Sequence, residues 1–222
     1  MTNMGTKAQT LCRIIEEVKS VRVLPSLIIT INEYENHKNG TIEKIQEYFK
    51  ESLLIVRSST SKEDSQEASF AGHYQSVLNV EKCNKQQLEL AINEVISSYE
   101  SQGDEEVLIQ PMLENIQFAG VIFTADIDTL ASYYVLNYEE GGGSEGITSG
   151  CGADFKTKVI YKKNNPIKEK EEWIATLLEQ CATLEAYFEN EYLDIEFGVD
   201  LNFQVTIFQV RPIANSKKEI VV

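Results

Sequence analysis

Two alternating segments near the end of the chain constrain its fold most. Residues 194–200 and 207–212 alternate apolar and polar side chains with the period of two that is typical of a β-strand. The connection over residues 201–204 is short, and Asp200 and Asn202 supply turn formers, which favours a hairpin. The sequence therefore predicts two paired strands at this end of the chain.

The polar positions of this hairpin predict a ligand site. Asp194 and Glu196 share one face of the first strand, and Gln209 and Arg211 share one face of the second. If these faces coincide, two carboxylates, an amide and a guanidinium meet on one patch of sheet. Carboxylate and amide oxygens are suitable Mg²⁺ ligands and a guanidinium binds phosphate, so the patch suits a magnesium nucleotide. A surface ladder of paired charges is the alternative interpretation.

Composition excludes several classes of protein. The chain has 222 residues, of which 42% are hydrophobic, so it can form a sizeable core. Its net charge of -15 argues against a nucleic-acid partner, although a small phosphate ligand needs only a few local cations. No apolar run is long enough for a membrane span, and the N-terminus does not resemble a secretory signal. The four cysteines are far apart, which favours reduced thiols in a cytoplasmic protein.

The remaining periodicity predicts a mixed architecture. Apolar residues at helical spacing predict helices near residues 6–20, 42–49, 88–99 and 173–188. Short apolar runs predict strands over residues 27–31, 53–56, 107–110, 120–124 and 133–137. The segments 107–110 and 120–124 are expected in one sheet. Hairpin-like strand pairs favour an α+β fold over a doubly wound parallel sheet.

Other residues suited to phosphate chemistry lie far from the hairpin in the sequence. Arg57 follows an apolar strand and precedes a run of hydroxyl residues, and Lys7 lies at a helix start, where free N–H groups favour an anion. The glycine-containing segments 68–74 and 141–146 could bring backbone N–H groups close to a phosphate. Solvated surface loops explain each of these features equally well. The histidines, His37 and His73, form no recognisable catalytic group.

Taken in order, these segments resemble one protein family. The matching blocks are residues 5–8 (GTKA), 56–64 (VRSSTSKED), 68–72 (ASFAG), 77–80 (VLNV), 107–112 (VLIQPM), 119–126 (AGVIFTAD), 143–150 (GSEGITSG), 194–196 (DIE) and 209–212 (QVRP). Together they are similar to the N-terminal nucleotide-binding domain of phosphoenolpyruvate synthase and pyruvate phosphate dikinase. The compact spacing is most similar to smaller relatives, one of which is an L-glutamine kinase.

The resemblance implies a fold and an activity. It implies an ATP-grasp domain over residues 1–213, with lobes of roughly 1–105 and 106–213 and the nucleotide bound between them. Residues 214–222 would be a tail or the start of a linker to a further domain. Members of the family bind MgATP and transfer a phosphoryl group to a histidine on a separate, swivelling domain. ATP is converted to AMP and phosphate in the synthase, and the phosphohistidine then supplies the final acceptor.

The resemblance also implies roles for individual residues. The catalytic, polyphosphate-binding residues would be Lys7, Arg57 and Arg211. The Mg²⁺ ligands would be Glu196 and Gln209, with Asp194 close by. The segment beside adenine would be Gln110, Pro111 and Met112, and Gly72 would belong to a loop that covers the phosphates. These roles suit phosphoryl transfer, which depends on positioning and charge neutralisation.

One departure from the family pattern leaves alternatives open. Neither His37 nor His73 has the glycine-rich setting of the family's phosphohistidine, so the partner histidine is expected on another domain or polypeptide. A non-catalytic nucleotide-binding interaction module is the main alternative. An ATP-grasp ligase is a further one, and it would require a carboxylate pocket that the sequence does not reveal.

Overall fold

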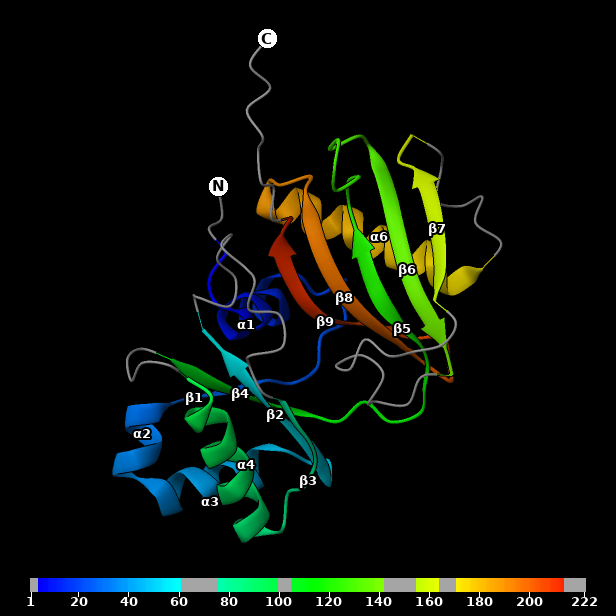
Figure 1. Ribbon diagram of the computed structural model, residues 1–222. Coiled ribbons are helices and arrows are strands. Elements are labelled where there is room, and N and C mark those ends of the chain that lie inside the picture. The colour runs from blue at the N-terminus through cyan, green and yellow to red at the C-terminus, as the bar shows by residue number, and fades with distance from the viewer. Residues whose placement is uncertain (1–3, 61–75, 100–104, 142–154, 164–170, 214–222) are drawn as a thin grey trace.

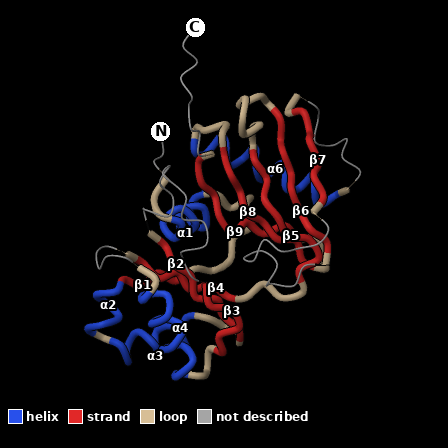
Figure 2. The backbone as a smooth tube through the Cα atoms, viewed as in Figure 1, coloured by secondary structure: helices blue, strands red, loops and turns tan. Residues whose placement is uncertain are grey.

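The computed structural model describes residues 4–60, 76–99, 105–141, 155–163 and 171–213. In this described part of the chain, two antiparallel sheets form two lobes, each with helices on one face (Figures 1 and 2). The prediction of a mixed α+β fold is confirmed. No described helix is both long and apolar enough to cross a lipid bilayer.

The first sheet has the strand order β1-β4-β2-β3, with bounds Leu27–Thr30, Glu106–Pro111, Leu53–Ser59 and Ser76–Glu81. Helices α2, α3 and α4, with bounds Ile31–Asn36, Lys38–Tyr48 and Lys85–Ser97, lie together in this lobe (Figure 1). Helices α3 and α4 bury Ile42, Ile45 and Leu88 against Leu54 and Val56 of β2. Because side chains alternate along β2, Ile55 and Arg57 lie on the opposite face, toward the second lobe.

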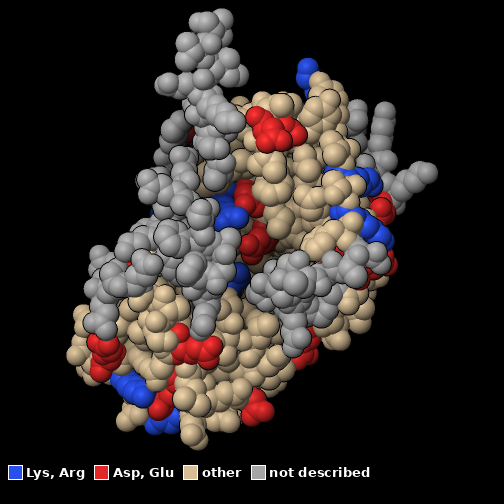
Figure 3. Space-filling view, in the orientation of Figure 1, with Lys and Arg blue, Asp and Glu red and all other residues tan. Residues whose placement is uncertain are grey.

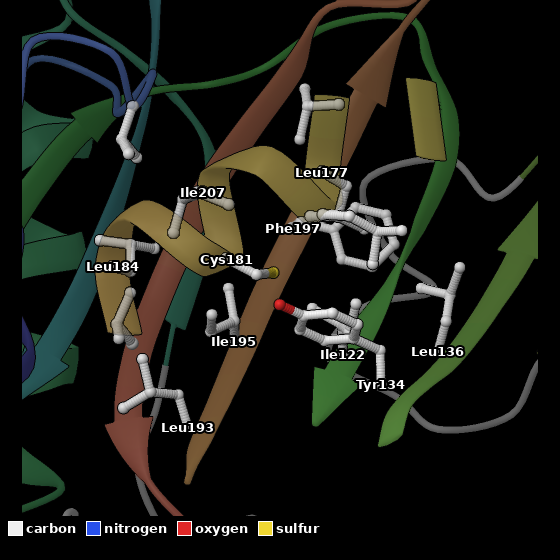
Figure 4. Close-up of a cluster of buried hydrophobic side chains, with 14 of the residues drawn as sticks. Ile122, Tyr134, Leu136, Leu177, Cys181, Leu184, Leu193, Ile195, Phe197 and Ile207 are labelled. Carbon is white, nitrogen blue, oxygen red and sulfur yellow. The ribbon is translucent and has the colours of Figure 1, made fainter. Parts of the chain in front are cut away.

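The second sheet has the order β7-β6-β5-β8-β9, with bounds Lys156–Tyr161, Tyr133–Glu140, Ile116–Phe123, Leu193–Asp200 and Val205–Pro212. Helix α6, Glu172–Phe188, covers one face of it. Figure 4 shows Leu177, Cys181 and Leu184 of this helix beside Ile195 and Phe197 of β8. Burial raises the pKa of the Cys181 thiol, so this residue is a neutral member of the core. Helix α6 does not cover the opposite face of the sheet, which is available for contacts with other parts of the molecule.

Helix α1, Lys7–Glu17, packs against both lobes. Thr6 caps it by accepting a hydrogen bond from the Gln9 N–H. Near its N-terminus, Ala8 and Leu11 pack with Leu108 of the first sheet. Its next turn places Ile14 in the core of the second lobe. The helix therefore joins the two lobes through apolar contacts at one side of the molecule.

The strand assignments differ from the sequence expectation in one sheet partner and in two strands that the periodicity does not predict, β3 and β7. The prediction that residues 107–110 and 120–124 share a sheet is wrong, since β4 lies between β1 and β2 and β5 lies in the second sheet. Apolar alternation identifies a strand but not its partner, which long-range pairing decides. The chain therefore changes sheet between Pro111 and Ile116, a few residues beyond the expected lobe division at 105 and 106. The alternation does not predict β7, because this edge strand buries only Ile160.

Candidate functional site

The register of the C-terminal hairpin brings its polar residues onto one face. Glu196 pairs with Gln209, and Asp194 pairs with Arg211. The intervening Ile195 is in the core beneath α6. The four polar residues therefore lie on the opposite face of the sheet, as the alternation predicts if the two strand faces coincide.

A pocket lies between the lobes next to this face. Its lining residues are Leu24, Ile55, Arg57, Leu78, Gln110, Pro111, Met112, Leu113, Ile116, Glu196 and Phe208. Its empty volume, including the open mouth, is about 490 Å³. Figure 3 shows a hollow between the lobes in which acidic and basic side chains gather. The pocket thus combines apolar walls with charges of both signs.

Arg57 spans the pocket from the first lobe to the second. One terminal nitrogen, Nη2, lies 3.6 Å from Oε2 of Glu196, and Nη1 donates to the Phe208 carbonyl at 3.5 Å. Its side chain is only 11% exposed, and its Nε is buried with no hydrogen-bond partner among the described residues. The guanidinium therefore keeps unused donor capacity at the pocket wall, which suits an anion.

The second charged pair of the site lies further along the hairpin. Arg211 donates from Nε to Oδ2 of Asp194 at 2.7 Å, and its Nη2 lies 2.7 Å from the same oxygen. Burial raises the pKa of the Asp194 carboxyl, and the neighbouring Arg211 guanidinium opposes that shift. The Arg211 side chain remains 40% exposed. Asp194 consequently orients a guanidinium that can still be reached from solvent.

Hydrogen bonds of the residues on either side of Lys7 fix the position of this lysine. The Ala8 N–H donates to Oγ of Ser59 at 3.0 Å, and Oγ1 of Thr6 donates to Oε2 of Glu106 at 2.7 Å. These bonds hold the start of α1 against the end of β2, the strand that carries Arg57, and against the start of β4. Lys7 itself is 6% exposed. A lysine from the beginning of the chain is thus built into the same region of the first lobe.

The segment after β4 brings a backbone donor to the pocket. The Gln110 side chain is buried and donates from Nε2 to Oγ of Ser26 at 2.9 Å. The Met112 N–H donates to the Leu53 carbonyl at 2.9 Å, which extends the pairing with β2. Among the described residues, the Leu113 N–H has no hydrogen-bond partner. Leu113 lines the pocket but carries no sequence signal that distinguishes it from its neighbours.

Several predicted positions lie outside this site or outside the described residues. Gly72, His73 and the glycine-rich segment 143–150 lie outside the described residues. His37 is exposed between α2 and α3. In the described part of the chain, no group of three or more His, Cys, Asp and Glu residues is placed to hold a metal ion.

Comparisons with solved structures define the class of fold. A D-Ala:D-Ser ligase from Enterococcus faecalis matches 93% of this chain over 52% of its own length, with 13% identity and a TM-score of 0.52. The D-alanine-D-alanine ligase from Coxiella burnetii matches 93% of this chain over 47% of its own length, with 10% identity and a TM-score of 0.56. A protein from Pyrococcus horikoshii Ot3 matches 93% of this chain over 88% of its own length, with 14% identity and a TM-score of 0.56. The fold is therefore an ATP-grasp fold, and the chain spans about half the length of these ligases.

Sequence comparison then identifies the family. The model of the pyruvate phosphate dikinase AMP/ATP-binding domain matches residues 39–152. The chain belongs to this family of nucleotide-binding domains, which confirms the resemblance noted from the sequence blocks. No curated protein matches the chain.

Proposed function

We propose that this chain binds MgATP in the pocket between its lobes and transfers a phosphoryl group to a histidine on a separate domain. This would be the first half-reaction of a phosphoenolpyruvate synthase-like phosphotransferase, in which ATP yields AMP and phosphate. The main support is the convergence of three separate sequence blocks: Arg57 meets Glu196 across the pocket, beside the segment 110–113. A small acceptor such as L-glutamine would receive the group in a later step.

The cations of the site suit a polyphosphate. Arg57 lines the pocket, and its Nε has no hydrogen-bond partner among the described residues. Arg211 is held by Asp194, and part of its side chain is exposed. Both guanidiniums can bind phosphate oxygens through paired donors. Lys7 at the start of α1 would add a third positive charge near the end of β2. These groups would position the phosphates and neutralise charge as it develops during transfer.

The donor set of the hairpin fits Mg²⁺. Glu196 offers a carboxylate and Gln209 an amide oxygen, and the two residues pair directly across the ladder. Mg²⁺ prefers such hard oxygen donors and usually retains waters and phosphate ligands. When bound, the ion would neutralise negative charge on the phosphates. Asp194 would lie close by and hold Arg211 in position.

The rest of the pocket suits the adenine base. Gln110 and Met112 use their donors inside the lobe, whereas the Leu113 N–H lies at the pocket and would donate a hydrogen bond to the edge of the base. Pro111 and Leu113 would flank the ring, and the apolar walls of the pocket would cover its faces. Gly72, in its small-residue segment, would supply the loop over the phosphates.

Nucleotide binding can be tested first and phosphoryl transfer second. The full chain should bind MgATP in isothermal titration calorimetry. With [β-³²P]ATP and a purified histidine-bearing domain, the label should appear as acid-labile phosphohistidine, and AMP should accumulate. Glu196→Ala should abolish transfer without unfolding the protein. Binding without any label on an intact histidine domain would contradict transfer and favour a non-catalytic nucleotide-binding module. Failure to bind MgATP would contradict both.

A further inference from the structure

The start of α1 is attached to one pair of residues at the end of the first sheet. Ser59 of β2 lies directly opposite Glu106 of β4 in the antiparallel ladder, so their side chains share one face of the sheet. Because side chains alternate along β2, Arg57 lies on this face too. Oγ of Ser59 accepts from the Ala8 N–H at 3.0 Å. The Ser59–Glu106 pair thus connects α1 to the strand that carries Arg57.

The Glu106 carboxylate binds the first turn of α1 through both of its oxygens. Oε2 accepts from the Thr6 hydroxyl at 2.7 Å, and Oε1 accepts from Nε2 of Gln9 at 3.0 Å. The Thr6 oxygen itself accepts from the Gln9 N–H at 3.3 Å, which makes Thr6 the N-cap of the helix. Because the hydroxyl hydrogen points to Glu106, the lone pairs of the oxygen can point to the helix. A carboxylate from β4 therefore completes the cap directly before Lys7.

Tyr99, which follows α4, holds the Ser59–Glu106 pair together. Its hydroxyl accepts from the Ser59 N–H at 3.1 Å and donates to the Glu106 carbonyl at 2.5 Å. These two backbone groups lie at the last paired position of β2 and β4. Ends of secondary structure open easily unless such partners hold them. The hydroxyl therefore fixes the position from which Glu106 reaches α1.

We propose that Glu106 is a positioning residue, which acts through the first turn of α1 to hold the Lys7 amine in a fixed position relative to the Arg57 guanidinium. The inference rests on the proposed nucleotide binding, in which both cations bind the same polyphosphate. Hydrogen bonds from the Ser59–Glu106 pair reach the residues on both sides of Lys7. Cations that are already in position need no reorganisation when a phosphate binds or reacts.

The sign of the effect separates positioning from simple electrostatics. A carboxylate near a phosphate site repels the ligand, so loss of the Glu106 charge alone would strengthen MgATP binding. Loss of a positioning contact would weaken binding instead, because the Lys7 side chain would then have to be ordered when the ligand binds.

The experiment is a double-mutant cycle, measured by isothermal titration calorimetry with MgATP. We expect Glu106→Ala to weaken binding by about fivefold and Lys7→Met by about tenfold, as for one hydrogen bond to a charged group. The double variant should bind like Lys7→Met alone, because no amine remains for Glu106 to position. A merely structural role of Glu106 would multiply the two losses. Magnesium tripolyphosphate, which lacks the base, should lose affinity for Glu106→Ala by the same factor as MgATP.

Glu17→Ala is the matched control at the other end of α1. Oε2 of Glu17 accepts from the Tyr187 hydroxyl at 2.7 Å, the same length as the contact of Glu106 with Thr6. Its loss removes a comparable hydrogen bond between α1 and the rest of the protein, but on the side away from Lys7. MgATP affinity should therefore stay at the wild-type value.

Four outcomes would overturn the inference while leaving nucleotide binding intact. They are unchanged or stronger MgATP binding in Glu106→Ala, multiplied losses in the double variant, wild-type affinity in Lys7→Met, and a loss confined to MgATP and absent for tripolyphosphate. If Glu106→Ala does not fold, Gln9→Leu removes one of the two bonds to the carboxylate and enters the same cycle. Failure of the wild-type chain to bind MgATP would instead refute the proposed function.

Discussion

Replacing Arg57 with methionine separates the role of its charge in binding from its role in stability. Methionine keeps an unbranched apolar stem but removes the guanidinium. The lost contacts are long, at 3.6 Å to Glu196 and 3.5 Å to the Phe208 carbonyl. Glu196 is 24% exposed and can be hydrated after the change. We therefore expect a loss of about 1 kcal/mol or less in the free energy of unfolding, as for a partly exposed ion pair.

The effect of the same change on nucleotide binding should be larger. A hydrogen bond to a charged group contributes about 1.5–3 kcal/mol when its partner would otherwise be left unpaired in a buried site. Each 1.4 kcal/mol corresponds to about a tenfold change in the dissociation constant. Loss of the Arg57 guanidinium should therefore weaken MgATP binding by about 10- to 100-fold. Calorimetric titration gives the affinity, and urea unfolding gives the stability of the same preparation.

Arg22→Met is the matched control for this experiment. Arg22 also forms an ion pair with the second sheet, through Nη1 at 3.1 Å from Oδ2 of Asp200, but it does not line the pocket. Its loss should lower stability by a similar amount and leave MgATP affinity unchanged. Unchanged affinity in Arg57→Met would refute the assignment of Arg57 as a phosphate ligand. Equal losses of affinity in the two variants would show that the effect is transmitted through the fold.

Three further changes test other parts of the structure. Arg211→Lys should lower the rate of histidine phosphorylation in the label-transfer assay, because an ammonium group cannot reproduce the two-donor contact with Asp194 or paired contacts with phosphate. Leu177→Ala should lower the free energy of unfolding in urea by about 2–5 kcal/mol, because this fully buried side chain packs in the core beneath α6. Burial alone would raise the pKa of Asp200, but the N–H groups of Gln204 and Asn202 and the Arg22 guanidinium outweigh it and lower the pKa. The ionised Asp200 therefore stabilises the fold above the unfolded carboxyl pKa of about 3.9. That contribution should disappear as the pH falls below this value, and urea unfolding from pH 6 to 3 should show a weaker pH dependence in Asp200→Asn.

Local periodicity predicted those elements whose burial follows a simple repeat. The helical spacing of Trp173, Leu177 and Cys181 corresponds to α6, which buries all three against the second sheet. The alternation of the C-terminal hairpin predicted both its strands and the shared face of Glu196 and Gln209. In each case the side-chain pattern depends only on neighbouring residues and one buried face, so the sequence contains the necessary information.

Local periodicity could not predict features that depend on residues far apart in the sequence. Strand β4 has the apolar pattern of any buried strand, and only its pairing with β1 and β2 assigns it to the first sheet. The register shifts between β2 and β3 and between β8 and β9 are likewise properties of strand pairing. Asn79 gives a weak hint, because asparagine tolerates a positive φ, whereas Phe208 gives none. Leu78 and Phe208 were therefore missed as lining residues of the pocket, whereas Pro111 and Met112 belong to the segment expected beside the base.

The charge arrangement also bears on how the ligand enters. Arg57 and Glu196 face each other across the pocket, one from each lobe. A phosphate without a cation would meet the repulsion of Glu196, and a cation without phosphate would meet that of Arg57. A magnesium nucleotide instead supplies an anion to the guanidinium and a cation to the carboxylate, so both charges find new partners together. By the reciprocity of linked binding, each component should raise the affinity for the other. If the chain binds MgATP as proposed, the pair would favour the complex over either component alone, while the apolar contacts of α1 continue to join the lobes.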